Sequence, residues 1–112
     1  MPRSPKTSAS TPFGRRLRDA RNRMGIAQDR LGVMIGLDEG ASSARMSRYE
    51  SGVHAPPVMT AKRLADVLAV PLAYFYCDDD RLANIILGYG QMDETGREQL
   101  AVLTEETMAR KR

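Results

Sequence analysis

The spacing of apolar residues near the start of the chain predicts an amphipathic helix. These residues recur every three or four positions, the interval at which side chains share one face of a helix. Thr11 is suited to cap the helix and Pro12 to occupy its first position, and Gly25 ends it. Most of the arginines in this segment fall on the opposite face. The predicted inward positions are Phe13, Leu17, Ala20 and Met24.

A second and a third helix are predicted on either side of a short polar segment. The second runs from Gln28 to Ile35. Asp38–Ala41 (DEGA) is polar and contains glycine, so we expect a loop there. Ser42 then caps the third helix, which ends at Gly52. The predicted inward residues of these two helices are Leu31, Met34, Ile35, Met46 and Tyr49.

The remainder of the chain also has a helical pattern. Two consecutive prolines at 56 and 57 precede a fourth helix, and Pro71 opens a short fifth one. Three aspartates at 78–80 begin a sixth helix that ends at Gly88 and Gly90, and Asp93 begins a seventh. No segment alternates apolar and polar residues as a strand would, so the expected fold class is all-α. The predicted apolar positions of this half are Met59, Ala61, Leu64, Ala65, Leu68, Leu72, Tyr74, Phe75, Leu82, Ile85, Ile86, Tyr89, Leu100, Val102 and Leu103.

Charge is distributed unevenly along the chain. The net charge is +3, yet residues 1–30 carry eight Arg or Lys and two Asp, whereas residues 66–112 carry five basic and nine acidic residues. A cationic half attracts polyanions, so nucleic acid is the leading partner on electrostatic grounds, with a merely solvated basic surface as the alternative. Residues 1–11 are predicted to form a mobile basic tail, in which Arg3 and Lys6 are candidates for contacts in the minor groove.

Composition argues against several classes of function. The 112 residues have room for one compact domain and a short appendage. With one cysteine, Cys77, and one histidine, His54, we predict no zinc site, no other metal site and no cofactor. No pair of nucleophile and base and no phosphate loop is present, so we do not expect an enzyme. No apolar run approaches the length of a membrane span, so we expect a cytoplasmic protein without membrane contact.

The segment from Gln28 to Gly52 has the features of a helix-turn-helix. Gly36 lies between two helices, and Gly32 lies four residues earlier, where a side chain larger than Ala would push the crossing helices apart. The outward face of the third helix is short and polar, with two arginines among small residues, and this shape fits the major groove of DNA. The face consists of Ser43, Ala44, Arg45, Ser47 and Arg48.

The chain resembles the lambda-repressor-like helix-turn-helix family, of the Xre type, across roughly Phe13 to Tyr76. The matching strings are LRDARNRMGIAQDRLGVMIGL, SSARMSRYESG and a later P-x-x-x-T-A-K-R-L-A-D-V-L-A-V-P. The resemblance implies a five-helix DNA-binding domain over residues 12–77, and residues 78–112 then form an extension of one or two C-terminal helices. It also implies a sequence-specific transcriptional regulator that binds double-stranded DNA, with repression as the favoured activity.

Positions that match the family imply roles for individual residues. Gln28 opens the second helix over a phosphate, and Ser51 meets the DNA backbone on the far side. Arg21 and Glu50 match an ion pair that joins the first helix to the end of the recognition helix, and a bidentate pair would fix the angle between them. The two arginines of the outward face suit bidentate contacts with guanine, whereas its two serines suit phosphate equally well. The residues implied to face base edges are Ser43, Ala44, Arg45 and Arg48.

Two features depart from the family pattern. Ala27 stands where the family usually has a Ser or Thr as helix cap. The predicted turn is also about four residues longer than the family's, because it includes the DEGA segment. Asp38 and Glu39 would repel phosphate, so we expect this loop to point away from DNA.

The apolar faces of the last two predicted helices leave two interpretations. They either pack back on the domain or form the interface of a symmetric homodimer, which we favour. A twofold pair would set the recognition helices about 34 Å apart and predict a palindromic operator. Two other functions remain open. One is an antitoxin or restriction-modification controller whose C-terminal helices bind a protein partner, and the other is a protein-interaction module that has kept the fold without DNA binding.

Overall fold

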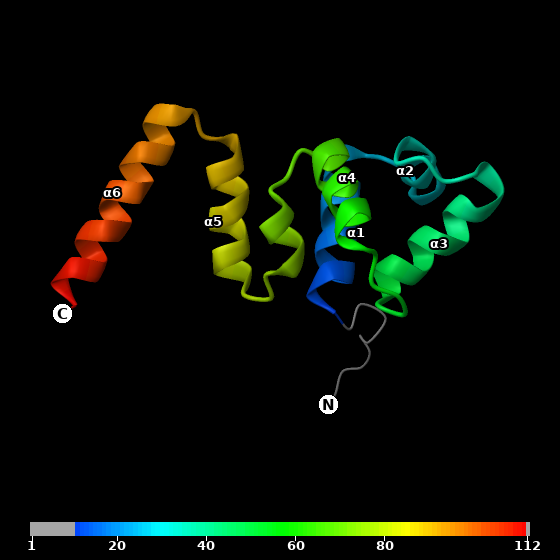
Figure 1. Ribbon diagram of the computed structural model, residues 1–112, viewed down its shortest axis with the longest axis horizontal. Coiled ribbons are helices and arrows are strands. Elements are labelled where there is room, and N and C mark those ends of the chain that lie inside the picture. The colour runs from blue at the N-terminus through cyan, green and yellow to red at the C-terminus, as the bar shows by residue number, and fades with distance from the viewer. Residues whose placement is uncertain (1–10, 112) are drawn as a thin grey trace.

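The computed structural model describes residues 11–111, and within this range the regular structure is entirely helical. Most of the predicted basic tail therefore lies outside the described residues. In the same range no helix is both long enough and apolar enough to cross a membrane. In chain order the elements are α1 (Pro12–Met24), α2 (Gln28–Met34), α3 (Glu39–Ser51), α4 (Val58–Leu68), the 3₁₀ helix η2 (Leu72–Tyr76), α5 (Asp80–Gln91) and α6 (Glu94–Arg110) (Figure 1).

The elements from α1 to η2 pack around one hydrophobic core. α1 packs against η2 and α3, and α2 packs against α3. The ring centroids of Phe13 in α1 and Phe75 in η2 lie 4.8 Å apart, which joins the first and last elements of this unit. The other large side chains that are fully buried belong to Leu17, Leu31, Met46 and Leu64.

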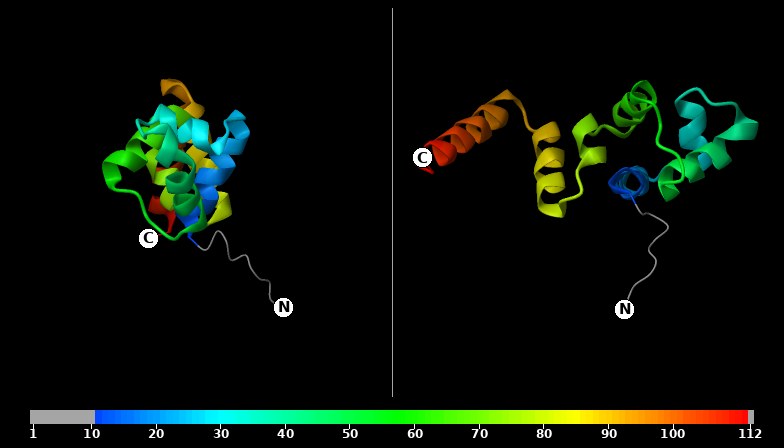
Figure 2. Two further views of the ribbon diagram at one scale, coloured as in Figure 1. Left: turned by 90° about the vertical axis from the view of Figure 1, so that its right-hand side faces the viewer. Right: turned by 60° about the horizontal axis from the view of Figure 1, so that its bottom comes forward.

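α5 and α6 extend from this unit as two diverging arms (Figures 1 and 2). α5 contacts η2 and contributes one buried residue, Ala83, whereas α6 contributes none. The predicted fold class is confirmed: the described chain is all-helical, with a five-helix lambda-repressor-like unit followed by two C-terminal helices.

Capping residues explain where three of the helices begin. The side chains of Thr11, Asp79 and Asp93 each accept a hydrogen bond, at 2.9–3.1 Å, from the backbone N–H three residues further on. Such a bond satisfies one of the free N–H groups of the first helical turn. The caps predicted at Thr11 and Asp93 are therefore confirmed.

The predicted loop at Asp38–Ala41 is wrong. Glu39 begins α3, so the supposed loop is the first turn of the recognition helix, and the connection to α2 is only residues 35–38. Acidic residues at a helix N-terminus interact favourably with the helix dipole, which supports this start despite Gly40. Ser42 consequently lies inside α3 instead of capping it. Its buried hydroxyl donates a hydrogen bond to the carbonyl of Asp29 in α2, at 2.5 Å.

Some other predicted boundaries and inward positions are also wrong. α5 continues through Gly88 and Gly90 to Gln91, and Gly90 packs so closely on Pro71 that a Cβ would lie 2.9 Å from the proline ring. Three predicted core methionines are exposed, and each lies at an end of its helix, where fewer neighbouring side chains can cover it. The exposed residues among the predicted inward positions are Met24, Met34, Met59, Leu82, Ile85, Tyr89, Val102 and Leu103.

Gly32 lies where α2 crosses α3, and the structure leaves less room there than the sequence predicted. A Cβ on Gly32 would overlap the hydroxyl of Ser42, and it would lie 2.9 Å from the Cβ of Ser42 and 3.0 Å from the Cγ of Met46. We expect Gly32→Ala to destabilise the fold by about 1–3 kcal/mol, measured as a lower melting temperature. Addition of Ser42→Gly should recover part of this loss, and a single variant with an unchanged melting temperature would contradict the close crossing.

Candidate nucleic-acid interface

α2 and α3 form the helix-turn-helix, and its scaffold is held by buried residues. Leu31, Met46 and Tyr49 are buried between the helices and α1. Ser42 adds the hydrogen bond to α2 described above. These contacts fix which side of α3 faces the core and leave the opposite side to solvent.

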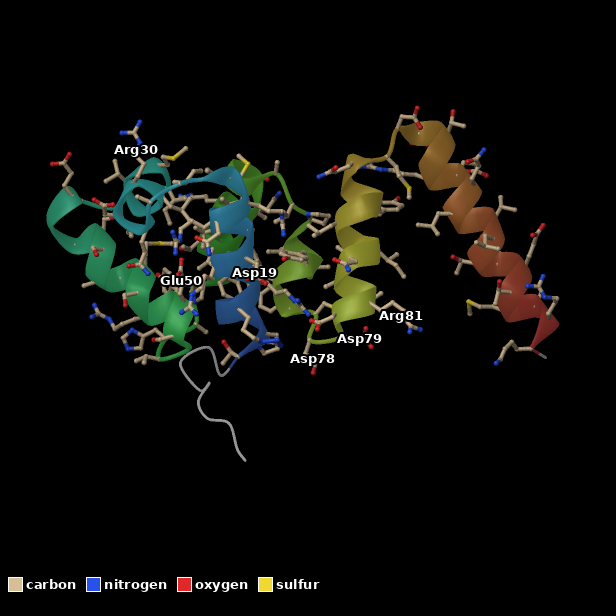
Figure 3. All side chains as sticks on the ribbon, turned by 180° about the vertical axis from the view of Figure 1, so that it is seen from behind. Asp19, Arg30, Glu50, Asp78, Asp79 and Arg81 are labelled. Carbon is tan, nitrogen blue, oxygen red and sulfur yellow. The ribbon has the colours of Figure 1, made fainter. Side chains whose placement is uncertain are left out.

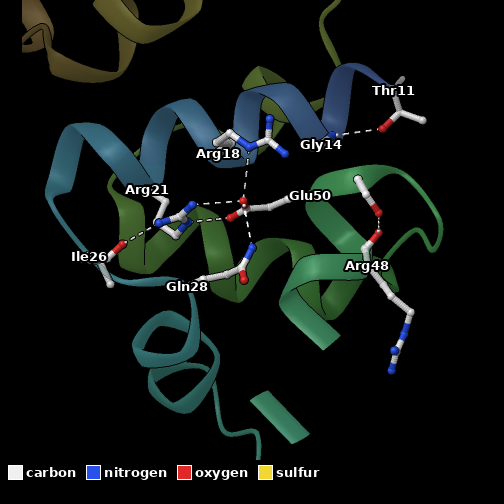
Figure 4. A network of polar contacts seen from close by, with 9 residues as sticks. Thr11, Gly14, Arg18, Arg21, Ile26, Gln28, Arg48 and Glu50 are labelled. Atoms are coloured by element: carbon white, nitrogen blue, oxygen red, sulfur yellow. Dashed lines mark hydrogen bonds and ion pairs between the residues drawn. The ribbon is translucent and has the colours of Figure 1, made fainter. Parts of the chain in front are cut away.

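A buried polar network joins α3 to α1 and α2 around Glu50 (Figure 4). The carboxylate of Glu50 is 1% exposed and accepts hydrogen bonds from Nε and Nη2 of Arg21 at 2.6 and 3.1 Å. Arg21 also donates to the carbonyl of Ile26, at 3.0 Å, and Arg18 lies 3.5 Å from the same carboxylate. The two residues expected to pair are thus in bidentate contact, which restricts both the distance and the angle between α1 and the end of α3.

Gln28 at the start of α2 belongs to the same network. Its Nε2 donates to Oε1 of Glu50 at 3.2 Å, a contact that the sequence did not predict. The amide group has two N–H donors, so one remains available to a phosphate while the other holds the side chain in place. The preceding Ala27 provides no side-chain cap, as its residue type predicts.

The predicted base-facing residues lie on the exposed side of α3. Figure 4 shows the Arg48 guanidinium directed away from the Glu50 network. Ser51 is half-buried, and its hydroxyl donates to the carbonyl of Arg48 at 3.3 Å. The remaining predicted residues, Ser43, Ala44, Arg45 and Ser47, are all exposed.

Arg16 is a structural residue that the sequence analysis missed. The pattern of the first helix predicts that most of its arginines face outward, yet Arg16 is buried. Its Nε donates to the carbonyl of Cys77 at 2.8 Å, and its Nη2 lies 3.0 Å from Oδ1 of Asp80. A signal was present, because Arg16 lies three residues after Phe13 and four before Ala20, on the apolar stripe itself.

The exposed side of α3 carries side chains that can donate hydrogen bonds. Among residues 11–111, no three His, Cys, Asp or Glu side chains are grouped in a way that could hold a metal ion. Exposed arginine and serine side chains on a rigid helix, beside an amide at the start of α2, are donors suited to phosphates and base edges.

Comparison with known proteins agrees with this geometry. Residues 12–73 match the model of a helix-turn-helix domain family. The chain is similar to the transcriptional repressor RstR of the cryptic phage CTXphi in Vibrio cholerae, with 28% identity over 103 residues that cover 88% of this chain and 89% of RstR. It is also similar to the crystal structure of the transcriptional regulator BswR, with 42% identity, a TM-score of 0.81, and coverage of 86% of this chain and 95% of BswR.

The family model covers more than half of the chain, and the fold is similar to that of a transcriptional regulator of known structure. The chain belongs to the helix-turn-helix family of DNA-binding transcriptional regulators, of the Xre type.

Proposed function

We propose that this protein is a sequence-specific repressor that binds a palindromic operator as a homodimer. The observation that carries the proposal is the buried Glu50 network, because it holds α3 at a fixed angle with its polar side toward solvent. A preorganised recognition helix can enter the major groove without the free-energy cost of reordering its scaffold. Similarity to the repressor RstR supports repression as the sign of regulation.

In the proposed complex, α3 lies in the major groove. Arg45 and Arg48 make bidentate contacts with guanine, the commonest specific contact of this kind, and Ala44 faces a base edge. Gln28 and Ser51 bind phosphates, which position the protein without reading sequence. The remaining predicted contacts, to bases or to phosphates, come from Ser43 and Ser47.

Because α3 begins at Glu39, this acidic residue is part of the recognition helix and not of a loop. Glu39 belongs to the helix and borders a hollow on the α2 side, together with Asp29, Arg30 and Val33. At 3.6 residues per turn, Glu39 lies on the opposite side of α3 from Arg48, although Ser43 lies one turn further along on the same side as Glu39. We therefore propose that the first turn of α3 lengthens the recognition helix, with the Glu39 carboxylate turned away from the bases that Arg48 contacts.

We propose that the two parts of the chain have different functions. Residues 12–77 bind DNA, and residues 78–112 join two copies. The support for the second part is the set of exposed apolar side chains on the two arms, among them Leu82, Ile85 and Leu103. Twofold symmetry would place the two recognition helices one turn of B-DNA apart, about 34 Å.

The experiment that tests the function is a titration of the full chain against DNA from its own upstream region and against random DNA. We expect tighter binding to the upstream fragment and a steep loss of affinity with salt, because phosphate contacts release counterions. Selection of bound sequences from a random pool should return a palindrome. No affinity for any upstream fragment at low salt would contradict the proposal.

Variants of the interface should separate base readout from phosphate contact. We expect Arg48→Ala, and likewise Arg45→Ala, to weaken operator binding by about 1–3 kcal/mol and to relax specificity at particular base pairs. Gln28→Ala should weaken operator and random DNA by similar factors. The measurement is the ratio of the two dissociation constants at one salt concentration, and equal losses on both DNAs for all three variants would contradict the assignment.

A further inference from the structure

An open apolar groove of about 640 Å³ lies between η2 and the N-terminal half of α5. Its walls include Leu72, Tyr76, Leu82 and Ile86, and Cys77 borders it. At the end where α5 begins, the groove is bordered by Asp78 and Asp79, which Figure 3 shows at the tip of the connection. The groove thus has apolar walls and a negatively charged end.

α6 has the complementary character. It is a helix of 17 residues with no buried residue, whereas most helices in proteins owe their stability chiefly to packing of one face against a neighbouring element. One stripe of α6 carries Leu100, Leu103, Thr104 and Thr107. The hydroxyls of both threonines donate to backbone carbonyls of α6 at 2.8 Å, so their methyl groups extend the apolar stripe. Packing of this stripe against an apolar surface would therefore stabilise α6.

The elbow between the arms holds α6 away from its own α5. Nε and Nη2 of Arg97 donate to the carbonyls of Tyr89 and Gly90 at 3.0 and 3.1 Å. The Arg97 guanidinium also lies 4.7 Å from the centroid of the Tyr89 ring. As Figure 1 shows, α6 diverges from α5 beyond this elbow, and Leu82 and Ile85 of α5 and Leu103 of α6 are exposed within one chain.

We propose that α6 of a second copy of this chain fills the groove, and that the first copy's α6 fills the groove of the second. Charge sets the register, because α6 ends with Arg110 and Lys111 while the groove ends with Asp78 and Asp79. Antiparallel packing of α6 against the other copy's α5 brings these unlike charges together at both symmetry-related sites. The inference rests on the homodimer proposed above and identifies the surfaces that join it.

The single cysteine of the chain provides a direct test. Cys77 borders the groove, Thr107→Cys places a second thiol on the apolar stripe of α6, and Val102→Cys places one on the opposite side of the same helix. Under mild oxidation we expect Thr107→Cys to form a covalent dimer of twice 12.4 kDa that a reductant reverses. The unsubstituted chain and Val102→Cys should remain largely at the monomer mass on a denaturing gel.

Charge reversal tests the register independently. We expect Asp78→Lys or Lys111→Glu to weaken self-association about five-fold, measured by sedimentation without DNA, since the contact occurs twice in the dimer. The combined variant should recover the original association. Asp38→Lys, at the exposed start of α3, is the matched control and should leave association unchanged.

The outcomes distinguish the inference from the proposed function. A chain that dimerises but cross-links equally through positions 102 and 107, with no effect of charge reversal, contradicts α6 exchange and leaves the homodimer intact. A chain that stays monomeric at every concentration contradicts both the exchange and the homodimer. This conclusion holds even if another protein or a small molecule is then found to occupy the groove. DNA binding is measured separately by the salt titration, so its failure does not depend on either result.

Discussion

Glu50→Ala is expected to destabilise the fold by about 3 kcal/mol, because the substitution breaks a buried ion pair and leaves its partners unsatisfied. The loss lies at the lower end of the usual range for buried ion pairs because Arg21 keeps 14% of its side chain exposed and can partly rehydrate. In a domain of this size, 3 kcal/mol corresponds to a fall in melting temperature of roughly 12 °C or more. Thermal unfolding followed by circular dichroism measures the change.

The same substitution should reduce DNA binding by more than the loss of folded protein explains. Glu50 orients Arg21, Arg18 and Gln28 together, so its removal frees the angle of α3 and the side chain proposed to bind a phosphate. Affinity is best compared at a temperature where the variant is fully folded. Glu39→Ala, on the exposed first turn of the same helix, is the matched control and should change stability by less than about 0.5 kcal/mol. An unchanged melting temperature for Glu50→Ala would contradict the structural role of the network.

The helices and most of the core were predictable because local periodicity determines them. The stripe of Ala61, Leu64, Ala65 and Leu68 needs no knowledge of distant residues, and all four side chains are buried. The Arg21–Glu50 pair came from the family resemblance, which carries information about positions far apart in the sequence. These parts of the fold and of the candidate site therefore follow from the chain alone or from its family.

The missed features depend on contacts between distant segments. The burial of Arg16 requires the carbonyl of Cys77, 61 residues further on, which no local pattern reports. The first turn of α3 has the composition of a loop, and its helical state is supported by the hydrogen bond from Ser42 to α2. Composition predicts the conformation that a short polar segment prefers in isolation. Packing against α2 determines the helical conformation that this segment adopts in the folded chain.

Gly14→Ala and Gly40→Ala are expected to change stability in opposite directions, although each adds one methyl group to a helical glycine. A Cβ on Gly14 would overlap the backbone carbonyl oxygen of Glu50 and lie 3.0 Å from the carbonyl carbon. Backbone atoms cannot rotate away as a side chain can, so α1 and α3 must separate. We expect a loss of about 2–3 kcal/mol together with weaker DNA binding, since the displacement also strains the Arg21–Glu50 pair.

At Gly40 no atom lies within 4 Å of the added Cβ, and alanine favours the helical state by about 0.5 kcal/mol in the first turn of α3. Its melting temperature should therefore rise by a few degrees, on the order of 2–4 °C. Both variants are measured by thermal unfolding without DNA, so that contacts to nucleic acid do not contribute. If Gly14→Ala were as stable as the unsubstituted chain, α1 and α3 could not approach as closely as the structure has them. In that case the angle of the recognition helix would depend on the Glu50 network and on the packing of α3 against α2, and not on close contact between the α1 and α3 backbones.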